Sequence, residues 1–308
     1  MSGGVITTGS LPKLLWPGLN QVFGMGYGEH EMTYTKLFDK VTSDKAYEEY
    51  QAVTGFGLGQ FKPQGTSISY DSQQQSYTTR LTNAAYALGF IVTHEEMKDN
   101  LYKKVASQRS KALGFSMRQC KEQVMHLIYN RAFTSGYVGG DGVTLCNTAH
   151  PNVSGGTFAN TPTVASDLSE ASLEDALIAI KGFQDDKGLF IDVKPKSLIV
   201  PRQEEWNALR LMKSVYQPGT ANNDINATNY ANAVPGGTVV SVYLTSPHAW
   251  FLRTDAGLDS TGMIYQERES IEFFDDNEFD TRNMKFGSYE RYSGGWSDPR
   301  CLWGNNGP

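Results

Sequence analysis

Seven carboxylates crowd into residues 267–280, where Arg268 is the only base. Two carboxylates on either side of a sugar linkage can hydrolyse it, so this run could belong to a carboxylate-based hydrolase. It lacks the glycine and the distal glutamate of a calcium-binding loop. Ile271 and Phe273 interleave with the acids, and this pattern favours a strand with a solvated or ion-paired face. The hydrolase therefore remains an alternative, and we expect the run to be a strand.

Cys146 and His150 have a C-x3-H spacing that occurs among zinc ligands. A structural zinc site needs about four ligands, and no second pair of cysteines or histidines follows nearby. The chain has three cysteines, at positions 120, 146 and 301, and none forms a C-x-x-C pair. An odd, scattered set predicts no disulfide framework and fits a reducing compartment. We expect no metal site.

Two glycine-rich stretches, residues 24–28 and 55–59, look like fragments of phosphate-binding loops. Neither completes the G-x-G-x-x-G spacing after a strand, and no G-K-[ST] follows. We expect them to be flexible arm and turn rather than cofactor sites. G-x-S-x-G and H-E-x-x-H are also absent, so we expect no catalytic residues, no cofactor and no enzyme activity.

The composition bounds the classes that remain. The chain has 308 residues, a net charge of −6, 19% charged and 12% aromatic residues. Such a chain can bury a large core and is not mainly disordered. Its charge argues against a generally basic nucleic-acid reader. No apolar run approaches the length needed to cross a bilayer. The N-terminus lacks the pattern of a secretory signal. We therefore expect no membrane contact.

The elements that must position any site begin with an arm. Residues 1–33 combine Gly, Pro and Thr with scattered apolar anchors such as Leu14, Trp16 and Phe23. This composition predicts an extended arm that is ordered only where it lies on something. Residues 34–53 have a more helical pattern, which ends at the glycines of 55–59.

Residues 60–93 predict a long antiparallel hairpin. Polar and apolar residues alternate over 66–71, the polar run 71–75 would be the tip, and β-branched and aromatic residues follow from Tyr77 to Thr93. Few large apolar residues lie near that tip. Because an isolated two-stranded hairpin is marginal in water, we expect this one to rest on another chain.

A helix of roughly 36 residues should follow, about 54 Å long at 1.5 Å per residue. Thr93 and Glu96 form a capping box, and apolar residues then recur every three or four positions up to Ile128. Residues 95–122 hold seven bases and four acids. These bases could simply form a charged helix face that keeps the protein soluble. Alternatively, they could form a basic stripe that contacts DNA phosphates, with Lys103, Lys104 and Lys111 as candidates.

The second half predicts mixed α and β structure. A loop occupies residues 141–163, an amphipathic helix runs over 173–183, and a buried strand at 197–200 precedes a helix that carries Trp206 and Leu209. Residues 217–237 are expected to form a loop. Further strands are expected at 238–245, 249–253, 263–265, 270–274 and 283–292.

This order of elements resembles the HK97-fold major capsid proteins of tailed bacteriophages, and the Mu-type major head subunits in particular. The stretches that carry the resemblance are YALGFIVTHEE (86–96), DGVTLCNTAHP (141–151), SLIVP (197–201), TSPHAWFLRTD (245–255) and YERYSGGWSDPR (289–300). The likeness spans roughly residues 35–308, and the ordered series gives it weight rather than any single motif.

The resemblance implies an α+β virion structural protein that forms hexamers and pentamers of an icosahedral head around double-stranded DNA. It implies an N-terminal arm (1–35), a peripheral (P) domain with a spine helix (36–59 and 94–163), an E-loop hairpin that lies over a neighbour (60–93), an axial (A) domain (164–245) and returning P-domain strands (246–308). Assembly in the bacterial host cytoplasm, a portal protein, a decoration protein and non-specific contact with DNA follow from the same likeness. Another virion component remains a further alternative.

The sequence departs from some relatives in two respects. Only about 35 residues precede the helical segment, so we expect scaffolding to come from a separate protein. Lys62 is the only lysine in residues 60–93 and should sit near the base of the hairpin, so we predict no covalent crosslink there. The intersubunit residues expected in the E-loop are Lys62, Gln64, Ile68, Tyr70, Gln74, Tyr77 and Arg80, and those expected in the arm are Leu14, Trp16 and Phe23.

Overall fold

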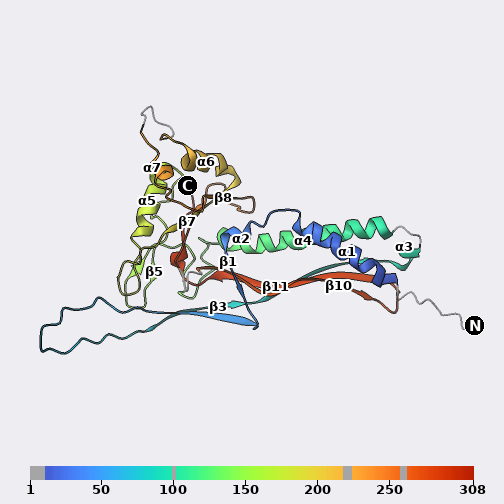
Figure 1. Ribbon diagram of the computed structural model, residues 1–308, viewed down its shortest axis with the longest axis horizontal. Helices are drawn as coiled ribbons and strands as arrows, with labels where there is room; N and C mark the ends of the chain where they lie inside the picture. The colour runs from blue at the N-terminus through green and yellow to red at the C-terminus, as the bar shows by residue number, and fades with distance from the viewer. Residues whose placement is uncertain (1–10, 99–101, 218–223, 257–261) are drawn as a thin grey trace, which may run out of the picture. The chain divides into compact units, whose positions relative to one another are not determined.

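The computed structural model describes the whole chain except residues 1–10, 99–101, 218–223 and 257–261 (Figure 1). Its described residues divide into two compact units, each built from separate stretches of the sequence. Unit 1 comprises the described residues within 1–32, 83–124 and 267–293, and unit 2 comprises those within 33–82, 125–266 and 294–308. Among the described residues, no helix combines the length and apolar character that crossing a bilayer requires.

Unit 1 packs helices on a sheet. In this unit β10, β11 and β4 lie side by side in that order, and β11 pairs antiparallel with β4 from Met284 opposite Val92 to Tyr292 opposite Ala84. Leu19, Phe23 and Phe286 belong to its apolar core. The elements that lie in unit 1 or pass through it are α1 (Leu11–Gly28), β4 (Ala84–Val92), α3 (His94–Lys98), α4 (Tyr102–Asn130), β10 (Met263–Asn277) and β11 (Met284–Trp296).

A buried charge cluster joins three elements of unit 1. The Lys121 ammonium of α4 lies 2.6 Å from the Glu290 carboxylate of β11 and donates to the Tyr27 hydroxyl of α1 at 2.7 Å. Both charged side chains are almost fully buried. Burial raises the pKa of Glu290, while Lys121 opposes that rise. Breaking such a pair would leave an unpaired charge buried in the core. The cluster therefore holds α1 against α4 and β11.

Unit 2 holds its core between a second sheet and helices α5 and α6. The sheet order is β12-β9-β7-β8, with β7 parallel to β8 and antiparallel to β9. Trp250 of β9 and Trp303 of β12 are buried side by side, with ring centroids 5.1 Å apart. The elements are α2 (Tyr34–Leu37), β1 (Asp39–Thr42), β2 (Tyr47–Val53), β3 (Gln75–Thr82), β5 (His150–Pro151), β6 (Thr157–Phe158), α5 (Glu170–Lys181), β7 (Pro195–Pro201), η2 (Arg202–Glu204), α6 (Glu205–Lys213), α7 (Ala227–Tyr230), β8 (Thr238–Ser241), β9 (Trp250–Thr254), η3 (Pro299–Cys301) and β12 (Leu302–Asn305).

Several sequence predictions are confirmed. Most of the predicted long helix is present as α4, and residues 94–98 are helical as α3; residues 99–101 lie outside the described part, so a single continuous helix stays a prediction. The capping box at its start is formed, since the Glu96 N–H donates to the Thr93 hydroxyl at 3.3 Å and the Thr93 N–H donates to the Glu96 carboxylate at 3.3 Å. The later helices and strands at 170–181, 195–201, 238–241, 250–254, 263–277 and 284–296 follow the predicted order.

The predicted strand pairing of 60–93 is wrong. The hairpin is made by β2 and β3, which pair antiparallel with Tyr47 opposite Thr82 and Glu49 opposite Arg80. Residues 84–92 form β4 and pair with β11 instead, some 200 residues further along the chain. Residues 54–74 between β2 and β3 have no regular structure, because their alternating side chains find no partner strand.

Two predictions near the N-terminus are also wrong. Residues 11–28 form helix α1 rather than an extended arm, and residues 34–53 hold only one turn of helix before β1 and β2. The contacts of Gly26 explain the first error. A Cβ at Gly26 would meet the Lys111 carbonyl oxygen at 2.4 Å, so the absent side chain lets α1 approach α4 closely. Tertiary packing thus overrides the poor helix propensity of the glycines.

Candidate assembly surface

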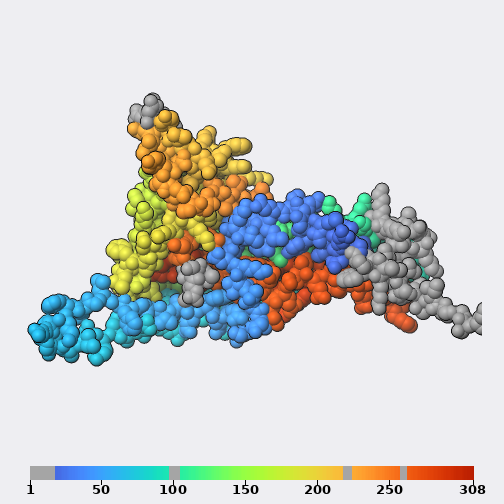
Figure 2. All heavy atoms as spheres, viewed as in Figure 1, coloured from blue at the N-terminus to red at the C-terminus, as the bar shows by residue number. Residues whose placement is uncertain are grey.

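The open segment, residues 54–74, is the most exposed stretch of unit 2. Nearly every residue after Thr54 is exposed, including large apolar side chains that compact proteins usually bury. Phe61 is 92% exposed, Tyr70 89% and Leu58 81%. Figure 1 draws the segment as a long open loop beyond the ends of β2 and β3, and Figure 2 shows its atoms (light blue) bare on the face in view. Such a run of bare apolar residues marks a binding surface.

The open segment is closed at its neck by polar contacts. The Thr54 N–H donates to the Gln74 carbonyl, and the Gln74 N–H donates to the Thr54 hydroxyl, both at 2.9 Å. One step further out, the Gly57 N–H donates to the Asp71 carboxylate at 2.8 Å. The Lys187 ammonium lies 3.3 Å from the same carboxylate. The Gly57 N–H, the Ser72 N–H and Lys187 together hold the pKa of Asp71 below its usual value.

The tip of the open segment lies at residues 63–66, not at 71–75 as the sequence analysis expected. The Thr66 N–H reaches back to the Pro63 carbonyl at 3.3 Å, and Gly65 adopts a φ of 85° that favours glycine. Lys62 precedes this turn and is exposed. The expectation that Lys62 sits near the base of the hairpin is therefore wrong.

The predicted E-loop residues fall into two groups. Lys62, Gln64, Ile68 and Tyr70 are exposed on the open segment. The other three lie at the neck or on β3: Gln74 closes the neck, Tyr77 lies on β3, and Arg80 pairs with Glu49 across the strands at 2.6 Å. The structure thus brings four of the seven residues to one exposed surface.

The predicted arm residues are not an exposed set. Phe23 is 4% exposed and stacks on Phe273 of its own chain, with ring centroids 5.0 Å apart. It is part of the unit 1 core, so the structure contradicts its assignment to a neighbouring subunit. Leu14 and Trp16 lie on α1, and their side chains fall outside the described residues.

The candidate DNA-facing lysines all lie on α4. The Lys111 ammonium pairs with the Glu29 carboxylate at 2.8 Å, so part of its charge is neutralised within the chain. Lys103 and Lys104 lie near the start of α4, and their side chains fall outside the described residues.

The residues with zinc-like spacing are used structurally. His150 is buried, with Nδ1 2.6 Å from the Asp141 carboxylate and Nε2 3.1 Å from the Asn160 side-chain oxygen. Cys146 is buried, and burial raises the pKa of its thiol. Within the described part of the chain, no cluster of three or more His, Cys, Asp or Glu could hold a metal.

The acidic run lies mostly on β10 and makes surface ion pairs. Glu269 pairs with Arg291 of β11 at 3.3 Å. Glu278, just beyond β10, pairs with Lys285 at 2.8 Å, which lowers its pKa. This is the strand with an ion-paired face that the sequence favoured.

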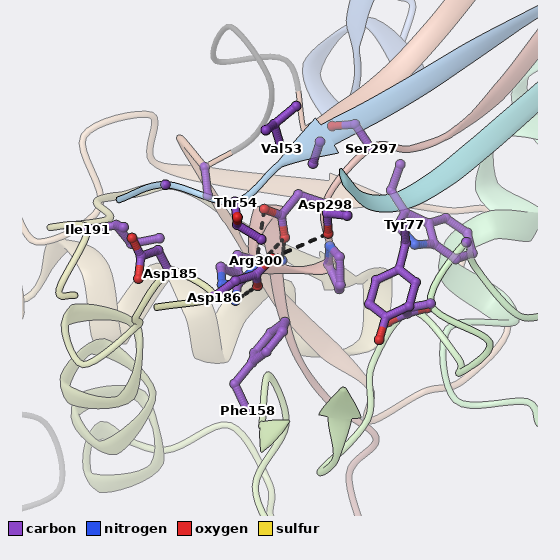
Figure 3. Close-up of a pocket in the computed structure, with 18 of the residues that line it drawn as sticks. Val53, Thr54, Tyr77, Phe158, Asp185, Asp186, Ile191, Ser297, Asp298 and Arg300 are labelled. Carbon is purple, nitrogen blue, oxygen red and sulfur yellow. Dashed lines mark hydrogen bonds and ion pairs between the residues drawn. The ribbon is translucent and has the colours of Figure 1, made fainter. Parts of the chain in front are cut away.

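A cavity of about 400 Å³ lies at the root of the hairpin (Figure 3). Arg300 occupies its floor, only 7% exposed, with its guanidinium 4.0 Å above the Phe158 ring. The guanidinium donates to the Asn152 side-chain oxygen at 2.9 Å and to Asp186 at 3.1 Å. No local sequence pattern indicates this cavity, because its lining comes from stretches about 250 residues apart. The carboxylates that line it are Asp141, Asp185, Asp186, Asp192, Asp255 and Asp298.

Comparisons with known structures identify the fold. The subunit of a virus-like particle from Pyrococcus furiosus matches with a TM-score of 0.54 at 9% identity, over 93% of this chain and 97% of that chain. The capsid of cyanophage P-SCSP1u matches with a TM-score of 0.54 at 12% identity, over 87% and 86%. The procapsid of bacteriophage JBD30 matches with a TM-score of 0.52 at 14% identity, over 98% and 77%. The fold is therefore the HK97-like capsid fold.

The family follows from the sequence match. A search of curated proteins found no match. A family model described as phage capsid protein matches residues 76–305, about three quarters of the chain. The match includes α3, α4 and the last strands, which are among the elements that carried the resemblance. The chain belongs to this phage capsid protein family and is a major capsid protein with an HK97-like fold.

Proposed function

We propose that copies of this chain assemble into hexamers and pentamers that tile an icosahedral head around double-stranded DNA. Membership of the capsid family places the protein in the virion capsid. The observation that carries the proposal is the open segment, which leaves Phe61 and Tyr70 bare on a single subunit. A surface of that kind is stable only when a partner covers it, and a shell supplies many identical partners.

The domain roles follow the resemblance, with both boundaries of the E-loop moved. We assign the E-loop to residues 47–82, since β2 and β3 form its stem and the open segment its end. The rest of the division is kept: an arm (1–35), a P-domain (the remainder of 36–59, 94–163 and 246–308) and an A-domain (164–245). Residues 83–93 join the P-domain, because β4 pairs with β11.

The proposal includes partners beyond the chain itself. A separate scaffolding protein directs closure in the host cytoplasm, a portal protein occupies one vertex, and a decoration protein binds outside. Packaged DNA makes non-specific contacts with the inner face, for which Lys103, Lys104 and Lys111 of α4 are candidates. The role is structural, with no catalytic step.

Electron microscopy and sedimentation of the full chain test this function. Expressed with and without its scaffold, the protein should form closed shells of uniform diameter. A chain that stays monomeric under every assembly condition contradicts the proposal.

A second variant tests the role of the open segment. Replacing residues 58–70 by two glycines keeps the Gly57–Asp71 contact at the neck, so the subunit should remain folded by circular dichroism and thermal unfolding. Closed shells should be lost. Shells of normal size from this variant would remove the E-loop assignment while leaving the capsid role intact.

A further inference from the structure

The end of the open segment carries one free charge. Across residues 54–74 the only charged side chains are Lys62 and Asp71, and Asp71 is committed to Gly57 and Lys187 at the neck. Lys62 makes no ion pair within the described part of the chain, and Phe61 beside it is 92% exposed. The tip therefore presents an aromatic ring and an ammonium group side by side.

The cavity at the root of the hairpin has the complementary chemistry. Its volume of about 400 Å³ lies in the range of roughly 300–1,000 Å³ typical of pockets that hold a ligand. Val53, Tyr77 and Ile191 are large apolar residues of its lining, and they lie on different sides of the cavity in the view (Figure 3). Six aspartates and one arginine line it, so the net charge of the lining is negative.

The arginine does not neutralise the lining. Arg300 is held by Asp186 at 3.1 Å and Asp298 at 3.4 Å, which leaves four further carboxylates in the lining. Asp192 is exposed and, among the described residues, makes no ion pair. A cation that enters the cavity therefore meets an unpaired carboxylate.

The tip of the same chain is carried away from this cavity. The neck holds the two arms of the open segment together at the Thr54–Gln74 and Gly57–Asp71 contacts, directly beside the cavity. Beyond Gly57 the chain continues outward to the turn at residues 63–66. A tip held at the end of these arms would have to reverse the whole segment to reach its own root, so the occupant must come from another copy.

We propose that the Phe61–Lys62 tip of one subunit docks in the hairpin-root cavity of the next, with Phe61 against apolar residues of its lining and the Lys62 ammonium on Asp192. This inference rests on the proposed capsid function and names the receptor for its E-loop. The contact is head-to-tail, and such a contact gives a ring when the rotation from one subunit to the next closes, as a capsomer requires.

Carbodiimide crosslinking of assembled particles tests the contact directly. The reagent joins an amine to a carboxylate only where the two touch, so peptides that contain Lys62 should be found linked to peptides that contain Asp192 or Asp185. Assembly from mixed 15N-labelled and unlabelled subunits should give links of mixed label, which proves that they join two copies. Lys62→Arg keeps the charge but cannot be acylated, so its particles should form and lack the link. Particles in which Lys62 is linked elsewhere, or to nothing, overturn the docking proposal.

A charge swap gives an independent test. Lys62→Glu and Asp192→Lys should each raise the subunit concentration needed for assembly by about tenfold or more, because each places like charges together. The double variant should recover most of that loss. Lys181→Glu and Asp175→Lys, exposed residues on α5 with the same changes of charge, serve as matched controls and should have little effect. Failure of the double variant to recover, with the wild type still forming shells, overturns the docking proposal alone. If the wild type forms no particles, the capsid function itself fails.

Discussion

At the scale of single residues, Arg300 organises the root of the hairpin. Its Nε donates to the Gln184 carbonyl at 2.8 Å, and its other nitrogens contact Asn152, Asp186 and Asp298. The planar guanidinium serves all of these acceptors at once, which an ammonium cannot do. Arg300 therefore ties the chain's last residues to two distant loops of unit 2.

Replacing Arg300 should destabilise unit 2. Arg300→Ala leaves Asp186 and Asp298 without their cation, and we expect a loss of about 2–4 kcal/mol in the free energy of unfolding. Arg300→Lys should lose about half as much free energy of unfolding, since lysine keeps the positive charge but lacks the planar set of N–H donors of the guanidinium. Urea unfolding measures both. Arg202→Ala, an exposed arginine of η2, should change stability by no more than about 0.5 kcal/mol. Equal midpoints for Arg300→Ala and Arg202→Ala would contradict this role.

The neck of the open segment should loosen in acid. The contacts with Gly57, Ser72 and Lys187 lower the pKa of Asp71 below its ordinary 3.8. Because the pKa of Asp71 is lower in the folded protein than in the unfolded chain, its ionised carboxylate stabilises the neck above pH 3.8. This stabilisation is lost as the pH falls through the lowered pKa of the folded protein. Hydrogen exchange at the Gly57 amide, corrected for the intrinsic rate, should show protection at pH 5 that declines below pH 3.8. Asp71→Asn should remove that dependence, and identical pH profiles for the two proteins would count against it.

At the scale of elements, α1 and α4 meet through glycines. A Cβ on Gly114 of α4 would lie 2.5 Å from the Phe23 carbonyl oxygen and 2.9 Å from the Tyr27 nitrogen. The Ser110 hydroxyl donates to the Leu19 carbonyl at 2.9 Å across the same helix contact. Backbone-to-backbone approach of this kind tolerates no side chain, so the glycines decide whether α1 docks.

Gly114→Ala should therefore weaken the docking of α1. The new methyl group meets backbone atoms that cannot move aside, and we expect a loss of about 1–3 kcal/mol. Gly18→Ala is the matched control, because nothing lies within 4 Å of its Cβ and alanine favours a helix by about 1 kcal/mol. Thermal unfolding and hydrogen exchange of residues 19–28 distinguish the two variants, because only Gly114→Ala should lower the stability and the protection of α1. Normal protection of α1 in Gly114→Ala would show that the close contact does not matter.

At the scale of the whole molecule, the proposed contact with packaged DNA depends on electrostatics. The chain has a net charge of −6, so DNA would be repelled unless bases gather locally. The double substitution Lys103→Glu and Lys104→Glu should make filled heads release DNA at a lower temperature, because it removes two phosphate contacts per subunit. A nuclease-protection assay on heated heads measures the release. Arg202→Ala heads provide the control, and unchanged retention would remove the role of α4 in DNA contact.

The sequence predicted this fold where the signal is local and failed where it is not. The long helix was found because its apolar period and its Thr93 cap lie in one stretch. Helix α1 was missed because the glycines that disfavour it are offset by contact with α4. The pairing of β4 with β11 was not predicted, because the sequence of a strand does not indicate which strand it pairs with when the partner lies about 200 residues away.

The candidate site shows the same division. The exposed, unsupported character of residues 66–70 was predictable, because polar residues alternate there with few apolar neighbours. The position of the tip could have been found from Pro63 and Gly65, which are turn residues. The cavity could not, since its walls come from β2, β3 and the loops around residues 185–192 and 296–300. Only folding brings those stretches together.

The discontinuous make-up of unit 1 has a consequence for how the protein is made. Its segments are residues 1–32, 83–124 and 267–293, so α1 emerges from the ribosome long before β10 and β11 exist to complete its binding site. Nascent chains fold domain by domain as they appear, yet this unit cannot be completed before residue 293 has been translated. A polypeptide that stops before residue 267 therefore lacks most of β10 and all of β11, and has no sheet on which α1 can pack.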